Sequence, residues 1–308
     1  MEGPGRAVVA GMGLAAGALA WSLIEAAAYQ VRRVDVPVLP AGVAPLRVLH
    51  LSDLHLAPWQ RRKREWLRGL AALEPDMTVV TGDFMGDMGA VPVVLDALDG
   101  LLHRPGAFVL GTNDYFAPKP RNPLRYLTGP SSDDRLNGVQ RLPTGDLVSG
   151  LTERGWVYLD NSRDHVSVGG VVIDLVGVDD PHHGFDQMPE PADRIDRAAL
   201  RLGIAHAPYR RVLDAMTADG AELIVSGHTH GGQVCVPGWG ALVTNCDLPQ
   251  RYAKGLFAWS PPVPPDGDAL AEPTRSWVHV SAGVGTSPFT PIRVACPPEV
   301  TLLRLTAR

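Results

Sequence analysis

The stretch Arg47-Val-Leu-His-Leu-Ser-Asp-Leu-His55 joins an apolar run to two polar residues, Asp53 and His55. A short run of this kind is typical of a strand that is buried on both faces of a sheet. Aspartate and histidine are common ligands of divalent metals. Because α/β folds usually place their sites at the carboxyl ends of strands, we expect Asp53 and His55 to lie at such an edge.

Three further apolar runs end in a turn that carries glycine and metal-type residues. They are Met77-Thr-Val-Val-Thr81 before Gly82-Asp83, Ala107-Phe-Val-Leu110 before Gly111-Thr-Asn-Asp114, and Glu222-Leu-Ile-Val-Ser226 before Gly227-His-Thr-His230. Glycine at these turns lets the backbone bend sharply and approach an ion or a phosphate closely. The repeated pattern predicts an α/β fold whose carboxylate, carboxamide and imidazole groups meet around divalent cations.

Together with His206, these four short segments of metal-type residues resemble the motifs of the calcineurin-like metallophosphoesterase superfamily, whose pattern is D-x-H, G-D, G-N-H-D/E, H and G-H-x-H. The match runs from about Arg47 to Gln233, and the segment from Val280 onward resembles a membrane-associated bacterial branch. The resemblance implies a four-layer α/β/β/α sandwich with two mixed sheets. The strand pattern by itself supports an α/β fold but does not show two sheets.

The resemblance also implies two divalent metal ions, which could be Mn, Fe or Zn. It assigns Asp53, His55 and His230 to the first ion, Asn113, His206 and His228 to the second, and Asp83 as the bridge between them. A bridging carboxylate offsets the repulsion between cations about 3.5–4 Å apart, and a water shared by them would attack phosphorus in line. Taken singly, the aspartates could be helix N-caps and the histidines ordinary loop residues.

One position departs from the family pattern. Where the family has histidine after its ligand asparagine, this chain has Asp114 after Asn113, and both join Asp83 as predicted catalytic residues. An aspartate supplies no positive charge and donates a proton only if its pKa is raised well above about 3.9. We therefore expect weaker activity on poor leaving groups, a substitute acid such as His182, or an altered substrate class. For His182, an ordinary polar loop is the alternative.

Two irregular segments are expected to contact the substrate. The first, from Tyr115 to Gly150, starts beside Asn113 and carries Arg121 and Arg125, which could supply the positive charge that Asp114 lacks. A surface insertion without a role at the site is the alternative for this segment. The second contains Tyr252.

The N-terminus forms a separate module. Residues 1–33 are expected to be a membrane anchor or signal-like segment, 34–46 a tether or first edge strand, and 47–308 the phosphoesterase domain. The uncharged run from Ala7 to Ile24 is just long enough to cross a bilayer as a single helix. A cleaved signal peptide and a buried soluble helix are the alternatives. Arg32 and Arg33 slightly favour a cytoplasmic domain, and the other side of the membrane stays open.

These features predict a dinuclear-metal hydrolase of phosphate esters or pyrophosphates, acting on a phosphorylated small molecule or lipid. The alternative is a catalytically weak metal-binding module that binds a phosphorylated envelope component or partner, which Asp114 favours. A net charge of -5 gives no electrostatic reason to expect nucleic acid binding.

Overall fold

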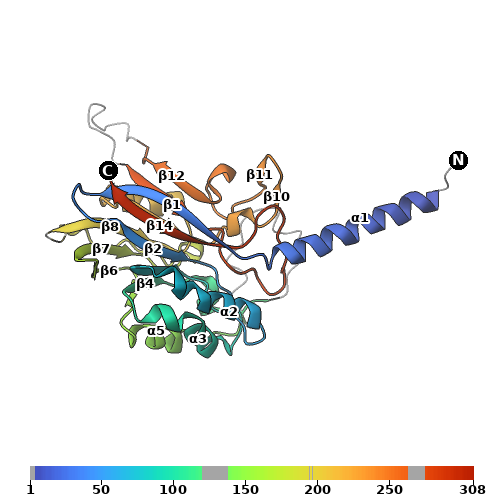
Figure 1. The fold of residues 1–308 in the computed structure, drawn as a ribbon, viewed down its shortest axis with the longest axis horizontal. Helices are drawn as coiled ribbons and strands as arrows, with labels where there is room; N and C mark the ends of the chain where they lie inside the picture. The colour runs from blue at the N-terminus through green and yellow to red at the C-terminus, as the bar shows by residue number, and fades with distance from the viewer. Residues whose placement is uncertain (1–3, 120–137, 194, 196, 263–274) are drawn as a thin grey trace.

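Two mixed β-sheets form the centre of the protein (Figure 1). The structure is a computed structural model that describes residues 4–119, 138–193, 195, 197–262 and 275–308. Within these residues each of the two sheets has six strands. The predicted mixed α/β fold is thereby confirmed, and the second sheet, which the strand pattern alone did not show, is present.

The first sheet carries the strands that lead into Asp53, Asp83 and Asn113. Its order is β1 (Gln30–Leu39), β14 (Glu299–Ala307), β2 (Leu46–Leu51), β3 (Met77–Thr81), β4 (Gly106–Val109) and β5 (Val157–Tyr158). Strands β2 to β5 are mutually parallel, whereas β14 runs antiparallel to β2. The segment expected to be a tether or edge strand lies partly in β1, which pairs with β14 at the edge of the sheet.

The second sheet carries the strands that lead into His206 and His228. Its order is β12 (Gly255–Trp259), β13 (Ser276–Val280), β9 (Leu223–Ser226), β8 (Ala198–Ile204), β7 (Val171–Gly177) and β6 (Ser162–Val168). The four middle strands are parallel and both edge strands are antiparallel to their neighbours. A two-stranded hairpin of β10 (Cys235–Val236) and β11 (Gly240–Ala241) follows the second sheet's metal-type turn.

Alternating strand residues divide the apolar core. Val79 of the first sheet and Leu202 and Val225 of the second belong to one buried cluster, so the sheets pack face to face. Val80 faces the other way and packs with α2 (Arg61–Gly69), α3 (Ala90–Leu102) and α5 (Thr144–Thr152). Ile224 of the second sheet packs with α6 (Arg210–Ala218). Short helices occupy the connections: η1 (Leu70–Leu73), α4 (Thr112–Tyr115), η4 (Pro181–His183), η5 (His230–Gly232) and η6 (Gln250–Tyr252).

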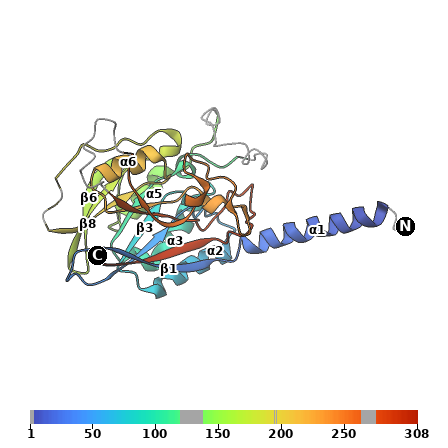
Figure 2. The ribbon, with the colours of Figure 1, turned by 90° about the horizontal axis from the view of Figure 1, so that it is seen from above.

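The N-terminal apolar run forms helix α1 (Pro4–Glu25), which projects away from the sheets in both views (Figures 1 and 2). Its last turn is attached to the body, because Glu25 Oε1 accepts a hydrogen bond from the backbone N–H of Cys296 at 2.6 Å. The predicted helix is therefore present. A helix long and apolar enough to cross a membrane was not found in the part of the chain that the structure describes.

A histidine pair joins the two sheets. His50 of β2 and His279 of β13 are 0% and 1% exposed, and their Nδ1 atoms lie 2.9 Å apart. Burial, and then repulsion from His279, lowers the pKa of His50 well below its usual value, and burial lowers the pKa of His279 to about 4. Both rings are therefore neutral in the folded protein near neutral pH.

This pair predicts a loss of stability in mild acid. Below about pH 6.5 the unfolded chain binds protons on these histidines that the folded chain does not, so the free energy of unfolding falls as the pH decreases. Each histidine contributes up to about 1.4 kcal/mol per pH unit between pH 6.5 and its folded pKa. The variant His279→Gln should show a shallower pH slope in denaturant unfolding at pH 7, 6 and 5. Parallel slopes for the two proteins would contradict this account.

Candidate metal centre

The predicted ligands meet where parallel strands of both sheets end. Strands β2, β3 and β4 lead into the turns that carry Asp53, Asp83 and Asn113, and β8 and β9 lead into His206 and His228. Hydrogen bonds tie the turns together: the N–H of Asp53 donates to the carbonyl of Gly82 at 3.0 Å, and that of Gly227 to the carbonyl of His206 at 2.8 Å. The structure thus brings together residues more than 170 positions apart, such as Asp53 and His228.

The first group of ligand atoms surrounds Asp53. His230 Nε2 lies 3.7 Å from Asp53 Oδ1, and His55 Nε2 lies 3.4 Å from Asp83 Oδ2. One ligand atom each from Asp53, His55 and His230 falls within 4.8 Å of the other two. A single ion could therefore contact all three side chains after small adjustments.

The second group surrounds Asp83. His206 Nε2 lies 3.7 Å from Asp83 Oδ1 and 3.2 Å from His228 Nδ1. His206 Nδ1 lies 2.7 Å from the carbonyl oxygen of Thr81, and His228 Nε2 lies 3.2 Å from both the carbonyl oxygen and the side-chain Nδ2 of Asn245. If these nitrogens carry the protons, the two facing nitrogens are left with lone pairs for a metal.

Buried atoms without partners test whether a metal fits. Among the described residues, Asp53 Oδ1, both ring nitrogens of His55 and Nδ1 of His230 are buried and accept or donate no hydrogen bond. Leaving such groups unpaired costs about 1–3 kcal/mol each. Carboxylate and imidazole are suitable donors for Mn, Fe or Zn, so the residues fit the ions that were expected.

Backbone strain marks the same residues. Five of the seven predicted ligands have a positive φ, namely Asp53, His55, Asp83, His228 and His230, with φ between 41° and 67°. This conformation is unfavourable for residues other than glycine and costs about 1–3 kcal/mol where it persists. Such strain gathers at functional sites, where the surrounding fold imposes it.

The electrostatics of the centre favour an ionised Asp83. Burial alone would raise the pKa of Asp83, but His206, His55 and the N–H groups of Asn113 outweigh it and hold the pKa below its usual value. Burial lowers the pKa of His206, yet the carboxylates of Asp83 and Asp180 outweigh it and raise that pKa to about 9. Without a metal, Asp83 and His206 therefore form a buried ion pair.

Asn113 and Asp114 both contact the Asp83 turn. The backbone N–H and the side-chain Nδ2 of Asn113 donate to the two carboxylate oxygens of Asp83, each at 2.8 Å. The carboxylate of Asp114 is fully buried and accepts hydrogen bonds from the backbone N–H groups of Asp83, Phe84, Met85 and Gly111 at 2.8 to 3.1 Å. Asp114 thus braces the turn that carries Asp83.

Two opposing effects act on the Asp114 carboxyl group. Burial, and then repulsion from Asp83, raises the pKa of Asp114 to about 8, although backbone N–H donors such as that of Gly111 favour the ionised form. With its oxygens turned towards these donors, the group has no free lone pair for a substrate.

Asp180 is a site residue that the sequence analysis missed. It is fully buried, its Oδ2 accepts a hydrogen bond from the Thr112 hydroxyl at 2.6 Å, and its Oδ1 accepts from the N–H of His182 at 2.9 Å. Its charge contributes to the raised pKa of His206. The signal was available, because Asp180 closely follows the apolar run Val171–Gly177, as the other acidic residues follow theirs.

The predicted substrate-binding residues are placed differently. The ring of His182 lies beside that of His228, with centroids 4.5 Å apart, and its Nδ1 is 3.1 Å from the Tyr209 hydroxyl. Tyr252 packs on Phe257, with ring centroids 4.3 Å apart. Arg121 and Arg125 lie outside the described residues. The roles of these four residues in substrate binding stay predictions.

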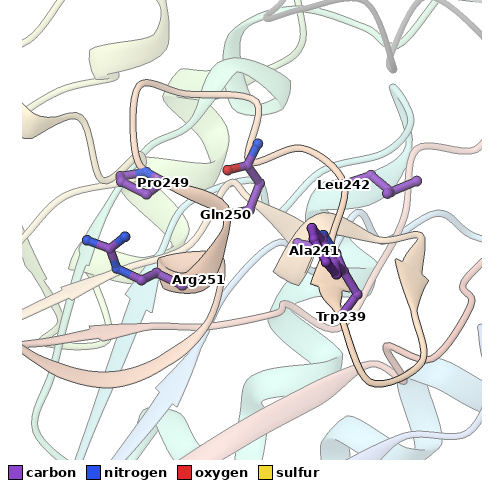
Figure 3. A pocket seen from close by; sticks show the side chains of 6 residues that line it. All are labelled: Trp239, Ala241, Leu242, Pro249, Gln250 and Arg251. Atoms are coloured by element: carbon purple, nitrogen blue, oxygen red, sulfur yellow. The ribbon is translucent and has the colours of Figure 1, made fainter.

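A separate cavity lies beside the β10–β11 hairpin (Figure 3). Its volume is about 350 Å³, and it is lined by Trp239, Ala241, Leu242, Pro249, Gln250 and Arg251. None of these lining residues is a predicted metal ligand. The cavity therefore belongs to the loop between η5 and η6 and not to the metal centre itself.

Comparison with known proteins identifies the family. Residues 46–232 match the model of the calcineurin-like phosphoesterase family. The chain belongs to this family. The matched range includes every predicted ligand, from Asp53 to His230.

Relatives from distant organisms cover most of the chain. A bovine "Transmembrane protein with metallophosphoesterase domain" is 27% identical over 90% of this chain and 57% of its own length. "Phosphodiesterase YaeI" of Escherichia coli is 25% identical over 90% of this chain and 88% of its own, and an "Uncharacterized metallophosphoesterase" of Aquifex aeolicus is 24% identical over 93% and 95%. The chain thus spans little more than half the length of the bovine relative.

Proposed function

We propose that this protein hydrolyses phosphate esters or pyrophosphates with the help of divalent metal ions. The observation that carries the proposal is the set of buried, unpartnered ligand atoms on Asp53, His55 and His230 next to the ionised Asp83. Membership of the calcineurin-like phosphoesterase family supports it. Bound ions would give these buried atoms partners and would give the five strained conformations a physical reason.

The proposal includes two ions. Asp53, His55 and His230 would hold the first, and Asn113, His206 and His228 the second, with Asp83 between them. When bound, the ions would polarise the phosphoryl group and provide a nucleophile from water. The protein's own part is to fix the ligands: Asn113 and Asp114 hold the Asp83 turn, and Asp180 adds negative charge beside His206. The four-layer α/β/β/α arrangement expected for the family belongs to the same proposal.

We also propose that the enzyme works at the cell membrane on an amphiphilic phosphorylated substrate, such as a phospholipid. Helix α1 exposes large apolar side chains away from the body, with Trp21 62%, Leu19 56% and Ile24 63% exposed. One relative, the bovine protein, is named as a transmembrane protein.

A metal-binding module with little catalytic power is the second candidate. Asp114 favours it, because its carboxylate is turned towards backbone donors and provides no positive charge for a substrate phosphate. Asp180, which accepts a hydrogen bond from the backbone N–H of His182, places a further carboxyl group near the second group of ligands, although burial raises its pKa. An anionic ester would gain less there than in a site with an additional cation.

Metal removal and restoration test the proposal. The full chain should hydrolyse p-nitrophenyl phosphate or bis-p-nitrophenyl phosphate only when Mn²⁺, Zn²⁺ or Fe²⁺ is restored after chelation, with a gain of at least about 100-fold. The preferred ester would indicate the substrate class. Equal hydrolysis with and without metal would contradict the proposal, and tight metal binding without hydrolysis of either ester would favour the metal-binding module.

A further inference from the structure

A chain of polar contacts runs from the metal centre into the interface between the sheets. Ser52 Oγ lies 2.6 Å from Asp53 Oδ2, Thr81 Oγ1 lies 2.7 Å from Ser52 Oγ, and His50 Nε2 lies 3.0 Å from Thr81 Oγ1. The Nδ1 atoms of His50 and His279 complete the chain at 2.9 Å. His50, Ser52 and Thr81 precede ligand turns without being predicted ligands, and all five residues are at most 1% exposed.

The direction of every hydrogen bond in this chain follows from its end. A carboxylate that binds a metal carries no proton, so Ser52 must donate to Asp53. The Ser52 hydroxyl then accepts from Thr81, and Thr81 accepts from Nε2–H of His50. A neutral His50 that is protonated at Nε2 has a bare Nδ1, which accepts from Nδ1–H of His279.

The reverse arrangement leaves a contact without a proton. If Thr81 donated to His50, the hydroxyl oxygens of Thr81 and Ser52 would face each other at 2.7 Å with no hydrogen between them. Two lone pairs at that distance repel each other. Only the direction from His279 to Asp53 gives each of the four contacts one donor and one acceptor.

This series of hydrogen bonds determines which carboxylate oxygen of Asp53 is available to a metal ion. Oδ2 accepts from Ser52 and from the backbone N–H of His228 at 3.0 Å, whereas Oδ1 has no partner among the described residues. With Oδ2 held twice, the carboxylate cannot rotate without breaking both bonds. Oδ1 is thereby directed towards His230, which lies 3.7 Å away.

We propose that His279, His50, Thr81 and Ser52 are positioning residues of the first metal site, acting as a one-directional hydrogen-bond relay that fixes the Asp53 carboxylate. The relay rests on the metal centre proposed above. It links the metal site to a contact between the two sheets, since His50 belongs to β2 and His279 to β13. Partners of this kind behind a metal ligand typically contribute about 10- to 100-fold to metal affinity.

Thr81 gives the sharpest test. Its carbonyl oxygen also holds His206 of the second group at 2.7 Å, and the substitution Thr81→Val keeps that carbonyl and nearly the same side-chain volume. Only the hydroxyl that joins His50 to Ser52 is lost. We expect one of the two ions to bind about 10- to 100-fold more weakly in this variant, while the other keeps its affinity.

The protein contains a matched control residue three positions before Thr81. Thr78 lies on the same strand, is fully buried, and its hydroxyl has no hydrogen-bond partner in the described part of the protein. Thr78→Val should therefore bind both ions like the unmodified protein, and Thr81→Ser, which keeps the hydroxyl, should retain most of the affinity. Titration of the metal-free full chain with Co²⁺, followed by calorimetry and visible absorption, measures these affinities and the geometry of the ion.

The outcomes separate the relay from the proposed function. If the unmodified protein binds no Co²⁺, the metal centre itself is refuted. If it binds two ions and Thr81→Val binds both with unchanged affinity, the relay is overturned while the metal centre stands. Should Thr81→Val fail to fold, Ser52→Ala replaces it, with the same expected loss. Nitrogen-15 NMR of the histidines should also find His50 protonated at Nε2, and protonation at Nδ1 would overturn the assigned direction.

Discussion

The variant Asp83→Ala is expected to lose metal-dependent ester hydrolysis by about 10³-fold or more. Asp83 lies close to a histidine of each set of ligands, with His55 at 3.4 Å and His206 at 3.7 Å. Without its charge, the two proposed cations would repel each other with less compensation, since only the carboxylate of Asp53 would remain in the two groups of ligands. A loss of about 4 kcal/mol in transition-state stabilisation corresponds to that factor in rate.

A control must distinguish the loss of a metal ligand in Asp83→Ala from a general loss of folding. Removing Asp83 also removes the acceptor for both N–H groups of Asn113, so the turn could loosen. Asp83→Asn keeps the shape and should lose activity almost as completely. Asp164→Ala removes a carboxylate that is 52% exposed on β6 and should leave activity unchanged. Metal-dependent hydrolysis that survives in both Asp83 variants, with normal melting temperatures, would refute the assignment of Asp83.

The strand-end residues could be predicted because the signal is local. An apolar run followed by a small residue, serine or glycine, and then a metal-type residue places the latter at the carboxyl end of a strand, and Asp53, Asp83 and His228 all lie there. Convergence of these ends across two sheets depends on pairings between distant segments. The insertion of β14 between β1 and β2, for example, joins residues about 250 positions apart and has no local signal.

Side-chain direction could not be predicted from residue type. The sequence places Asp114 after the asparagine, and only the structure shows that its carboxylate faces four backbone donors of the Asp83 and Gly111 turns. Arg293 is likewise fully buried, and its guanidinium donates to the carbonyls of Ala282, Gly283 and Gly285. In both cases the partners are backbone groups, which every sequence contains and which therefore leave no trace in its composition.

The variant Gly227→Ala is expected to disrupt both folding stability and the first metal site. A Cβ atom at this position would lie 1.7 Å from Ser52 Oγ and 2.6 Å from Asp53 Oδ2, so the Ser52–Asp53 turn or the end of β9 must move. Overpacking of this kind costs about 1–3 kcal/mol, and the displaced carboxylate would lose its fixed direction. We expect a lower melting temperature and metal binding weakened at least as much as in Thr81→Val.

The control for this variant is Gly145→Ala in α5, where a Cβ atom would meet nothing within 4 Å. That change should raise stability slightly, by about 0.4–1 kcal/mol, because alanine restricts the unfolded chain. Thermal unfolding and Co²⁺ titration of the three proteins measure both effects, and a Gly227→Ala protein that matches the unmodified one would contradict the account.

Thr81→Val removes a hydrogen bond without adding volume, whereas Gly227→Ala adds volume without removing a donor. If both weaken the same ion, the cause they share is the position of the Asp53 carboxylate.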